Sequence, residues 1–105
     1  MRIEVIGEDE SSNPQARTYA EYKVFAALVR HTQRVRGARV VLQRDERDRT
    51  CNSVACAVTV ALEPSGSVRA RGRGPHAYAA VNRTVERLGN IMRRRALRSR
   101  SHLPS

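Results

Sequence analysis

Residues 74–97 read GPHAYAAVNRTVERLGNIMRRRAL, and this stretch decides how the rest of the chain is arranged. At 3.6 residues per turn its apolar side chains fall on one helical face and its basic side chains on the opposite face. The apolar face comprises Ala77, Tyr78, Val81, Val85, Leu88, Ile91 and Met92, and the other comprises Arg83, Arg87, Asn90 and Arg94. Pro75 suits the first turn, where a missing N–H costs nothing. The pattern predicts a helix ending near Leu97, with one face on a core and the other offered to an anion or, in the simplest interpretation, to solvent.

The charge balance favours the anion. The chain has 105 residues, enough for one domain, and a formal net charge of +10. All of its basic residues except Lys23 are arginine, whose guanidinium forks two donors onto a phosphate. From Pro64 onward there are ten arginines and one acid, Glu86, whereas residues 1–63 are nearly balanced. The second half of the chain is therefore expected to bind a polyanion.

Several function classes find no support in the composition. Aromatic residues make up 4% of the chain, too few for a surface that stacks unpaired bases. No apolar run is long enough to span a membrane and the N-terminus does not resemble a signal peptide, so we expect a cytoplasmic protein. Cys51 and Cys56 match no metal or redox spacing and are expected to be buried or half-buried thiols, and no histidine completes a ligand set. We expect no metal, no cofactor and no small-molecule substrate.

The chain before residue 74 alternates between strand and helix patterns. Residues 1–7 predict a short strand, and residues 15–31 predict an amphipathic helix that begins near Pro14. Residues 38–43 form a β-branched run, followed by a charged cluster at residues 44–49 that we expect to be a solvated loop. Gly37 is expected in the turn between helix and strand.

A β-hairpin is predicted next. Residues 52–62 alternate, with Val54, Cys56, Val58, Val60 and Leu62 on one face. After a turn at residues 63–66, a second strand places Val68, Ala70 and Gly72 inward and Arg69, Arg71 and Arg73 outward.

These elements predict an α+β fold of order β-α-β-β-β-α, in which two helices pack on one face of a four-stranded sheet, as in double-stranded RNA-binding domains. Residues 1–97 would form a single domain, and residues 98–105 a basic flexible tail.

Three segments resemble one known family. The segments VRGARVVLQRDE, VTVALEPSGSVRARGRG and HAYAAVNRTVERLGNIMRR resemble ribosome hibernation promoting factors and ribosome-associated inhibitors, also called sigma-54 modulation proteins, in their short single-domain form. The first helix, YAEYKVFAAL, is similar to the family's Tyr-Val-Glu-Lys-Lys-Leu pattern at Tyr19, Glu21 and Lys23. The chain departs from the family at His76 and Asn82, where the family has acids.

The resemblance implies a non-catalytic protein that binds the small ribosomal subunit in the channel shared by mRNA and tRNA, inhibits translation and promotes hibernation under stress. It also places Lys23 among the RNA-binding residues. Small-subunit rRNA would be the partner, and the protein would be monomeric off the ribosome. The candidate RNA contacts from the residue pattern are Arg83, Arg87 and Arg94 on the helix, with Arg93, Arg98 and the strand residues Arg69, Arg71 and Arg73 as a second tier.

Two alternatives remain open. The chain could be a general double-stranded RNA or nucleic-acid module without ribosome specificity, because such domains share the core topology. If both helices cover one face of the sheet, the strand arginines emerge on the other, so the helix face and the strand row would be alternative contact surfaces. No catalytic arrangement of residues is present to favour an enzyme.

Overall fold

The computed structural model describes residues 1–7, 13–45 and 53–101, the last four by their backbone alone. Its elements are β1 (Arg2–Gly7), α1 (Pro14–Leu28), a 3₁₀ turn η1 (Val29–His31), β2 (Val35–Arg44), β3 (Val54–Leu62), β4 (Ser67–Gly74) and α2 (Ala77–Ser101). The predicted order of strands and helices is confirmed.

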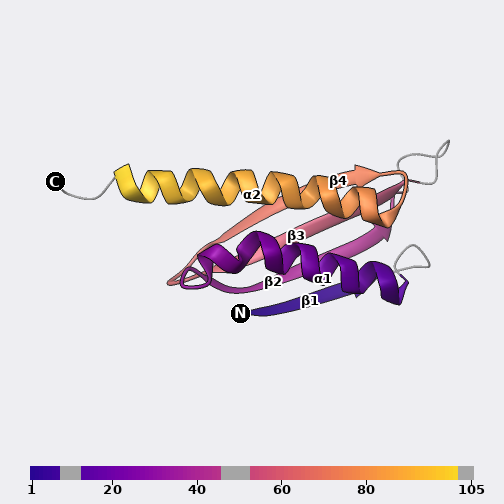
Figure 1. Cartoon of the computed structure of the whole chain (residues 1–105), viewed down its shortest axis with the longest axis horizontal. Coiled ribbons are helices and arrows are strands. Elements are labelled where there is room, and N and C mark those ends of the chain that lie inside the picture. Colours follow the sequence, from indigo (N-terminus) through magenta and orange to yellow (C-terminus); the bar gives the residue numbers. More distant parts are fainter. Residues whose placement is uncertain (8–12, 46–52, 102–105) are drawn as a thin grey trace.

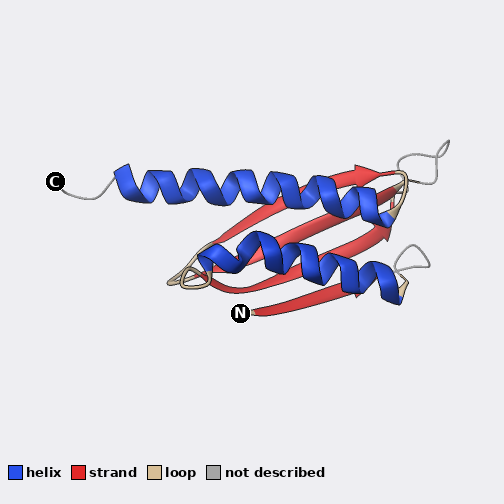
Figure 2. Ribbon diagram, viewed as in Figure 1, coloured by secondary structure: helices blue, strands red, loops and turns tan. Residues whose placement is uncertain are grey.

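One sheet and one layer of helices make up the molecule. The strands lie in the order β1-β2-β3-β4, with β1 parallel to β2 and the other neighbours antiparallel. Figure 1 shows α1 and α2 side by side over the same face of the sheet, and Figure 2 shows the two layers by colour. Within residues 1–7, 13–45 and 53–101, no helix covers the opposite face of the sheet (Figure 1), as the sequence predicts.

The core lies between the sheet and the helices, and strand alternation determines which residues enter it. On β3 every second residue from Val54 to Leu62 is buried, and on β4 the buried positions alternate with exposed arginines. Helix α1 contributes Ala16, Ala20, Val24 and Leu28, spaced four apart, and α2 contributes Val81 and Leu88 among others. Both helices pack an apolar face on the core, as predicted, but Tyr78, which the spacing placed on that face of α2, is exposed.

Helix α2 presses closely on β4 because two strand residues there are glycines. A Cβ on Gly72 would meet Thr84 Oγ1 at 2.6 Å, and a Cβ on Gly74 would meet Ala80 N at 2.8 Å. Thr84 is fully buried at this contact, and its hydroxyl lies 2.8 Å from the carbonyl oxygen of Ala80 one turn earlier. The close approach fixes α2 directly above the edge strand of the sheet.

The outward side of α1 differs from the expectation of a simple amphipathic helix. Tyr22, Phe25 and Val29 are exposed on the side away from the core, with Tyr22 67% accessible. The helix start follows the prediction, since Asn13 accepts a hydrogen bond from Ala16 N at 2.7 Å and Pro14 occupies the first turn.

Several boundaries differ from the sequence prediction. Helix α1 ends at Leu28 and residues 29–31 form η1, and helix α2 begins at Ala77, so Pro75 precedes the helix rather than lying in its first turn. Strand β2 begins at Val35, so Gly37 lies inside the strand, next to a register shift. A Cβ on Gly37 would lie 2.9 Å from the carbonyl oxygen of Arg2, so β1 can approach this closely only because residue 37 is a glycine. Strand β3 begins at Val54, and Asn52 is outside the described residues. Helix α2 continues to Ser101, so residues 98–101, expected in a tail, are helical, while residues 102–105 lie outside the description.

Candidate nucleic-acid interface

The arginine row of β4 points away from the helices. Arg69, Arg71 and Arg73 are exposed and alternate with the buried Val68, Ala70 and Gly72. Across the sheet they stand opposite Thr59, Ala57 and Ala55 of β3. Small neighbours on β3 leave the guanidinium groups accessible from the uncovered face.

Two arginines of α2 reach the same edge of the sheet. Arg83 Nη1 donates to the carbonyl oxygen of Arg73 at 2.9 Å, and Arg87 Nη1 donates to the carbonyl oxygen of Arg71 at 2.6 Å. Because β4 is an edge strand, these carbonyls have no further strand to pair with, and the helix arginines satisfy them. A guanidinium has five N–H donors, so one bond to a carbonyl leaves others for an anion.

The strand row and these two helix arginines line one hollow of about 530 Å³, which we call the arginine groove. Its basic residues are Arg69, Arg71, Arg73, Arg83 and Arg87. The sequence left open whether the strand row and the helix face form one surface, and the structure places these five arginines around one hollow. They meet because α2 lies over the edge strand and the side chains of Arg83 and Arg87 reach its carbonyl oxygens.

Gln43 and Asp45 are groove residues that the sequence reasoning missed. Asp45 is 8% exposed and accepts a hydrogen bond from Arg73 Nη1 at 2.9 Å, so its expected place in a solvated loop is wrong. Arg44, the first residue of that cluster, is the last residue of β2 rather than part of a loop, and residues 46–49 lie outside the described residues. The signal in the sequence that could have identified Asp45 is its position as an acidic residue directly after β2, the strand that pairs with the hairpin. Asp45 orients Arg73 and neutralises its charge. The other four arginines of the groove keep it strongly positive.

The remaining predicted contacts lie apart from the groove. Arg93 and Arg94 are exposed further along α2, and Arg93 Nη2 donates to Asn90 Oδ1. Lys23 lies on α1, with its ammonium 5.9 Å from the ring centroid of Tyr19. Arg98 belongs to α2 by its backbone, and its side chain is outside the description.

The two positions that depart from the resembled family retain local functions. His76 Nδ1 accepts a hydrogen bond from Ala79 N at 3.2 Å, so the imidazole caps the start of α2. Asn82 Oδ1 accepts a bond from Tyr19 Oη at 2.5 Å, which joins the two helices. Tyr78, 37% exposed, packs edge-to-face on Tyr19 with ring centroids 5.1 Å apart.

Other chemistry is sparse in the part of the chain that the structure describes. No group of three or more His, Cys, Asp or Glu side chains there could hold a metal ion. Burial raises the pKa of the Cys56 thiol, opposed by a hydrogen bond with Thr84, and Cys51 lies outside the described residues. Neither described helix has the length and apolar character needed to cross a membrane.

Comparisons with known proteins agree on the fold. A family model described as sigma 54 modulation protein / S30EA ribosomal protein matches residues 3–100. The N-terminal domain of Protein Y from Thermus thermophilus is similar at a TM-score of 0.71 and 27% identity, over 90% of this chain and 98% of that one. A ribosomal subunit interface protein from Coxiella burnetii has the same fold, at a TM-score of 0.73 and 15% identity over 92% and 99%. Curated protein sequences give no match.

Proposed function

The chain belongs to the sigma-54 modulation protein / S30EA ribosomal protein family, and we propose that it associates with the ribosome as a binding protein rather than an enzyme. Its target is rRNA of the small subunit, in the channel shared by mRNA and tRNA. Occupation of that channel blocks translation and promotes hibernation under stress. The protein acts in the cytoplasm and is monomeric off the ribosome.

The arginine groove is the observation that supports this proposal. Phosphate contacts dominate the affinity of proteins for nucleic acid, and arginine binds phosphate with two parallel hydrogen bonds. Carbonyl oxygens of β4 hold the guanidinium groups of Arg83 and Arg87 beside the strand row, so several cations are in place before RNA arrives. Preorganised side chains lose less conformational entropy on binding.

Arg93, Arg94 and Arg98 extend the contact beyond the groove along α2. The helix continues past Met92, its last buried residue, and projects beyond the sheet (Figure 1). Lys23 is assigned a contact by the family resemblance alone. Together these residues offer a basic surface that follows an RNA backbone over more than one phosphate.

Co-sedimentation with purified small and large subunits tests the target. We expect the protein to pellet with the small subunit and to reduce translation of a reporter mRNA at stoichiometric concentration. An mRNA with a strong ribosome-binding sequence, bound first, should reduce retention of the protein if the two share the channel. Equal pelleting with both subunits would contradict the proposed target.

Competition with free duplex RNA tests the alternative of a general nucleic-acid module. A protein specific for the ribosome keeps its subunit when a molar excess of a 20-base-pair RNA duplex is added. Displacement by duplex at a concentration comparable to that of the ribosomes would instead favour a module that reads only phosphates and helix shape.

A further inference from the structure

A second hollow, separate from the arginine groove, lies at the other end of the sheet. It has a volume of about 560 Å³ and lies where the β3–β4 turn, the segment from η1 to Arg34 and the later part of α2 meet. We call it the hairpin hollow. Its size is in the range of small-molecule binding sites.

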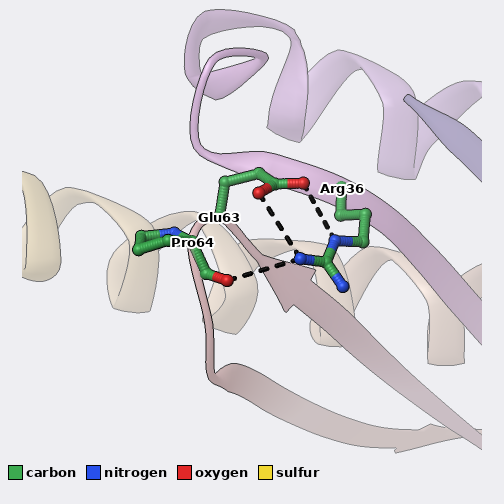
Figure 3. Close-up of polar contacts among 3 residues, drawn as sticks. All are labelled: Arg36, Glu63 and Pro64. Carbon is green, nitrogen blue, oxygen red and sulfur yellow. Dashed lines mark hydrogen bonds and ion pairs between the residues drawn. The ribbon is translucent and has the colours of Figure 1, made fainter.

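The wall formed by the β3–β4 turn is held in place by Arg36 (Figure 3). Arg36 Nε donates to Glu63 Oε1 at 2.9 Å, and Arg36 Nη2 donates to Glu63 Oε2 at 3.4 Å and to the Pro64 carbonyl at 3.3 Å. The guanidinium holds the pKa of the Glu63 carboxyl below its usual range, through hydrogen bonding and then charge. Glu63 is thus committed to Arg36, and its charge is compensated at the rim of the hollow.

The apolar part of the lining comes from the end of the core. Leu62 is 8% exposed and Met92 is 3% exposed, and both belong to the core cluster, with Ala96 one turn beyond Met92. Helix α1 ends at Leu28 and η1 follows it as far as His31, while α2 continues. The apolar surface that stays accessible here comes from Pro64, which is exposed, and Ala96, which is half-buried, over Leu62 and Met92.

Three basic side chains line the same hollow: His31, Arg34 and Arg95. Arg95 lies on the helical face that α2 otherwise uses for the core, three residues after Met92. Across residues 1–7, 13–45 and 53–97, no carboxylate pairs with Arg95 or with the ring of His31. Cations beside an apolar floor fit an anion that has an apolar ring as well as a charge.

We propose that the hairpin hollow binds a nucleotide. The base rests against Pro64 and Ala96, over the buried Leu62 and Met92, and the phosphate is bound by Arg95 and Arg34, with His31 beside them. The nucleotide is either free or an unpaired nucleotide of an RNA chain, since both present a base and a phosphate. This site does not depend on the proposed ribosome association.

Titration calorimetry with AMP, joined to amide NMR shifts, tests the site on the intact chain. AMP should bind saturably, with shifts centred on residues 31–34, 62–65 and 92–96. Arg95→Met, which keeps the volume of an exposed side chain and removes its charge, should weaken AMP at least tenfold. Arg30→Met is the matched control, because Arg30 lies beside His31 but outside the lining, and it should change affinity less than twofold.

Inorganic phosphate tests the phosphate part of the ligand alone, and adenosine tests the base and sugar alone. Each should bind at least tenfold more weakly than AMP. Release of the protein from small subunits by AMP identifies an RNA nucleotide as the natural source, and unchanged retention identifies a free nucleotide. The proposal is overturned by absence of saturable AMP binding at millimolar concentration, by equal losses in the two variants, or by phosphate binding as tightly as AMP.

Discussion

The arginine groove and the hairpin hollow border the same helix but are built differently. In the groove, Arg83 and Arg87 are held by main-chain carbonyls, and the small half-buried side chains Ala55 and Ala57 of β3 leave the arginines accessible. In the hollow, Arg95 has no described carboxylate partner, and Pro64 and Ala96 give an accessible apolar surface at the end of the core. The first suits a chain of regularly spaced phosphates and the second a single anion with an apolar body.

Helix geometry explains how one element serves both surfaces. Arg95 follows Arg87 by eight residues, which corresponds to roughly 12 Å along the axis and a rotation of about 80°. The groove therefore lies on the β4-edge side of α2, and the hollow lies beneath its later turns. A substitution on α2 can therefore disturb the arginine groove alone, the hairpin hollow alone, or both together.

Leu88→Ala should have the largest effect, because Leu88 is fully buried between the two surfaces. We expect the free energy of unfolding to fall by about 2–5 kcal/mol, from lost burial and a residual cavity. Urea denaturation measures the change. Leu97→Ala is the matched control on the same helix, since Leu97 is 63% exposed, and it should stay within about 0.5 kcal/mol of wild type. Similar losses in both would contradict the assigned core face.

Gly72→Ala should disturb the groove more than the hollow. The new Cβ would meet Thr84 at 2.6 Å and push α2 away from β4, so we expect a loss of about 1–3 kcal/mol in stability and altered amide shifts at Arg83 and Arg87. Gly89→Ala makes the same chemical change on α2 where nothing lies within 4 Å, and should stabilise by about 0.5–1 kcal/mol. The same sign for both variants would refute the close approach.

His76→Asp tests the start of α2, on the groove side of the helix. An aspartate keeps the capping acceptor for Ala79 N and adds a negative charge at the helix N-terminus, so stability should rise by about 0.5–1 kcal/mol. His76→Ala removes the acceptor and should lower it by a similar amount. Thermal unfolding of the three proteins at pH 7 provides the comparison, and an unchanged melting temperature in both variants would argue against the cap.

The smallest effect concerns the wall of the hollow. Arg36 lowers the pKa of Glu63, so this pair stabilises the fold above the ordinary carboxyl pKa and the contribution is lost as pH falls through the lowered value. Both side chains are exposed, and the change in stability should be slight. Carboxyl NMR titration should show the Glu63 pKa rising toward its ordinary value in Arg36→Gln. Arg39→Gln, which removes a different surface ion pair, should leave Glu63 unchanged.

Much of this architecture could be predicted from local patterns. Alternation on β3 and β4 and helical spacing on α1 and α2 identify most core-facing residues of those elements, because period and burial are linked directly. On α2 the spacing missed Ala80 and Thr84, which are fully buried, and wrongly included Tyr78, which is exposed. The start of β2 could not be found this way. Its Gly37 is typical of a turn, and only the parallel partner β1, distant in sequence, explains a glycine inside the strand.

The arginines of the groove could be singled out from the sequence, but the way they come together could not. Charge asymmetry and spacing identify Arg69, Arg71, Arg73, Arg83 and Arg87, yet their meeting depends on α2 lying over an edge strand. The pairing of Asp45 with Arg73 spans 28 residues and depends on strand register. The hairpin hollow is lined by η1, the β3–β4 turn and the later turns of α2, which are far apart in the sequence, so no single segment predicts it.

The dependence of small-subunit affinity on salt tests the central claim that the arginine groove binds rRNA phosphates. Wild type, Arg83→Gln/Arg87→Gln and the charge-matched control Arg17→Gln/Arg30→Gln are compared from 50 to 300 mM salt. The groove variant should bind at least tenfold more weakly near 150 mM, and its log–log slope should be smaller by about 1.5–2, the value for two lost phosphate contacts. The control should keep the wild-type slope. Equal slopes for all three proteins, or equal losses in both variants, would contradict the account.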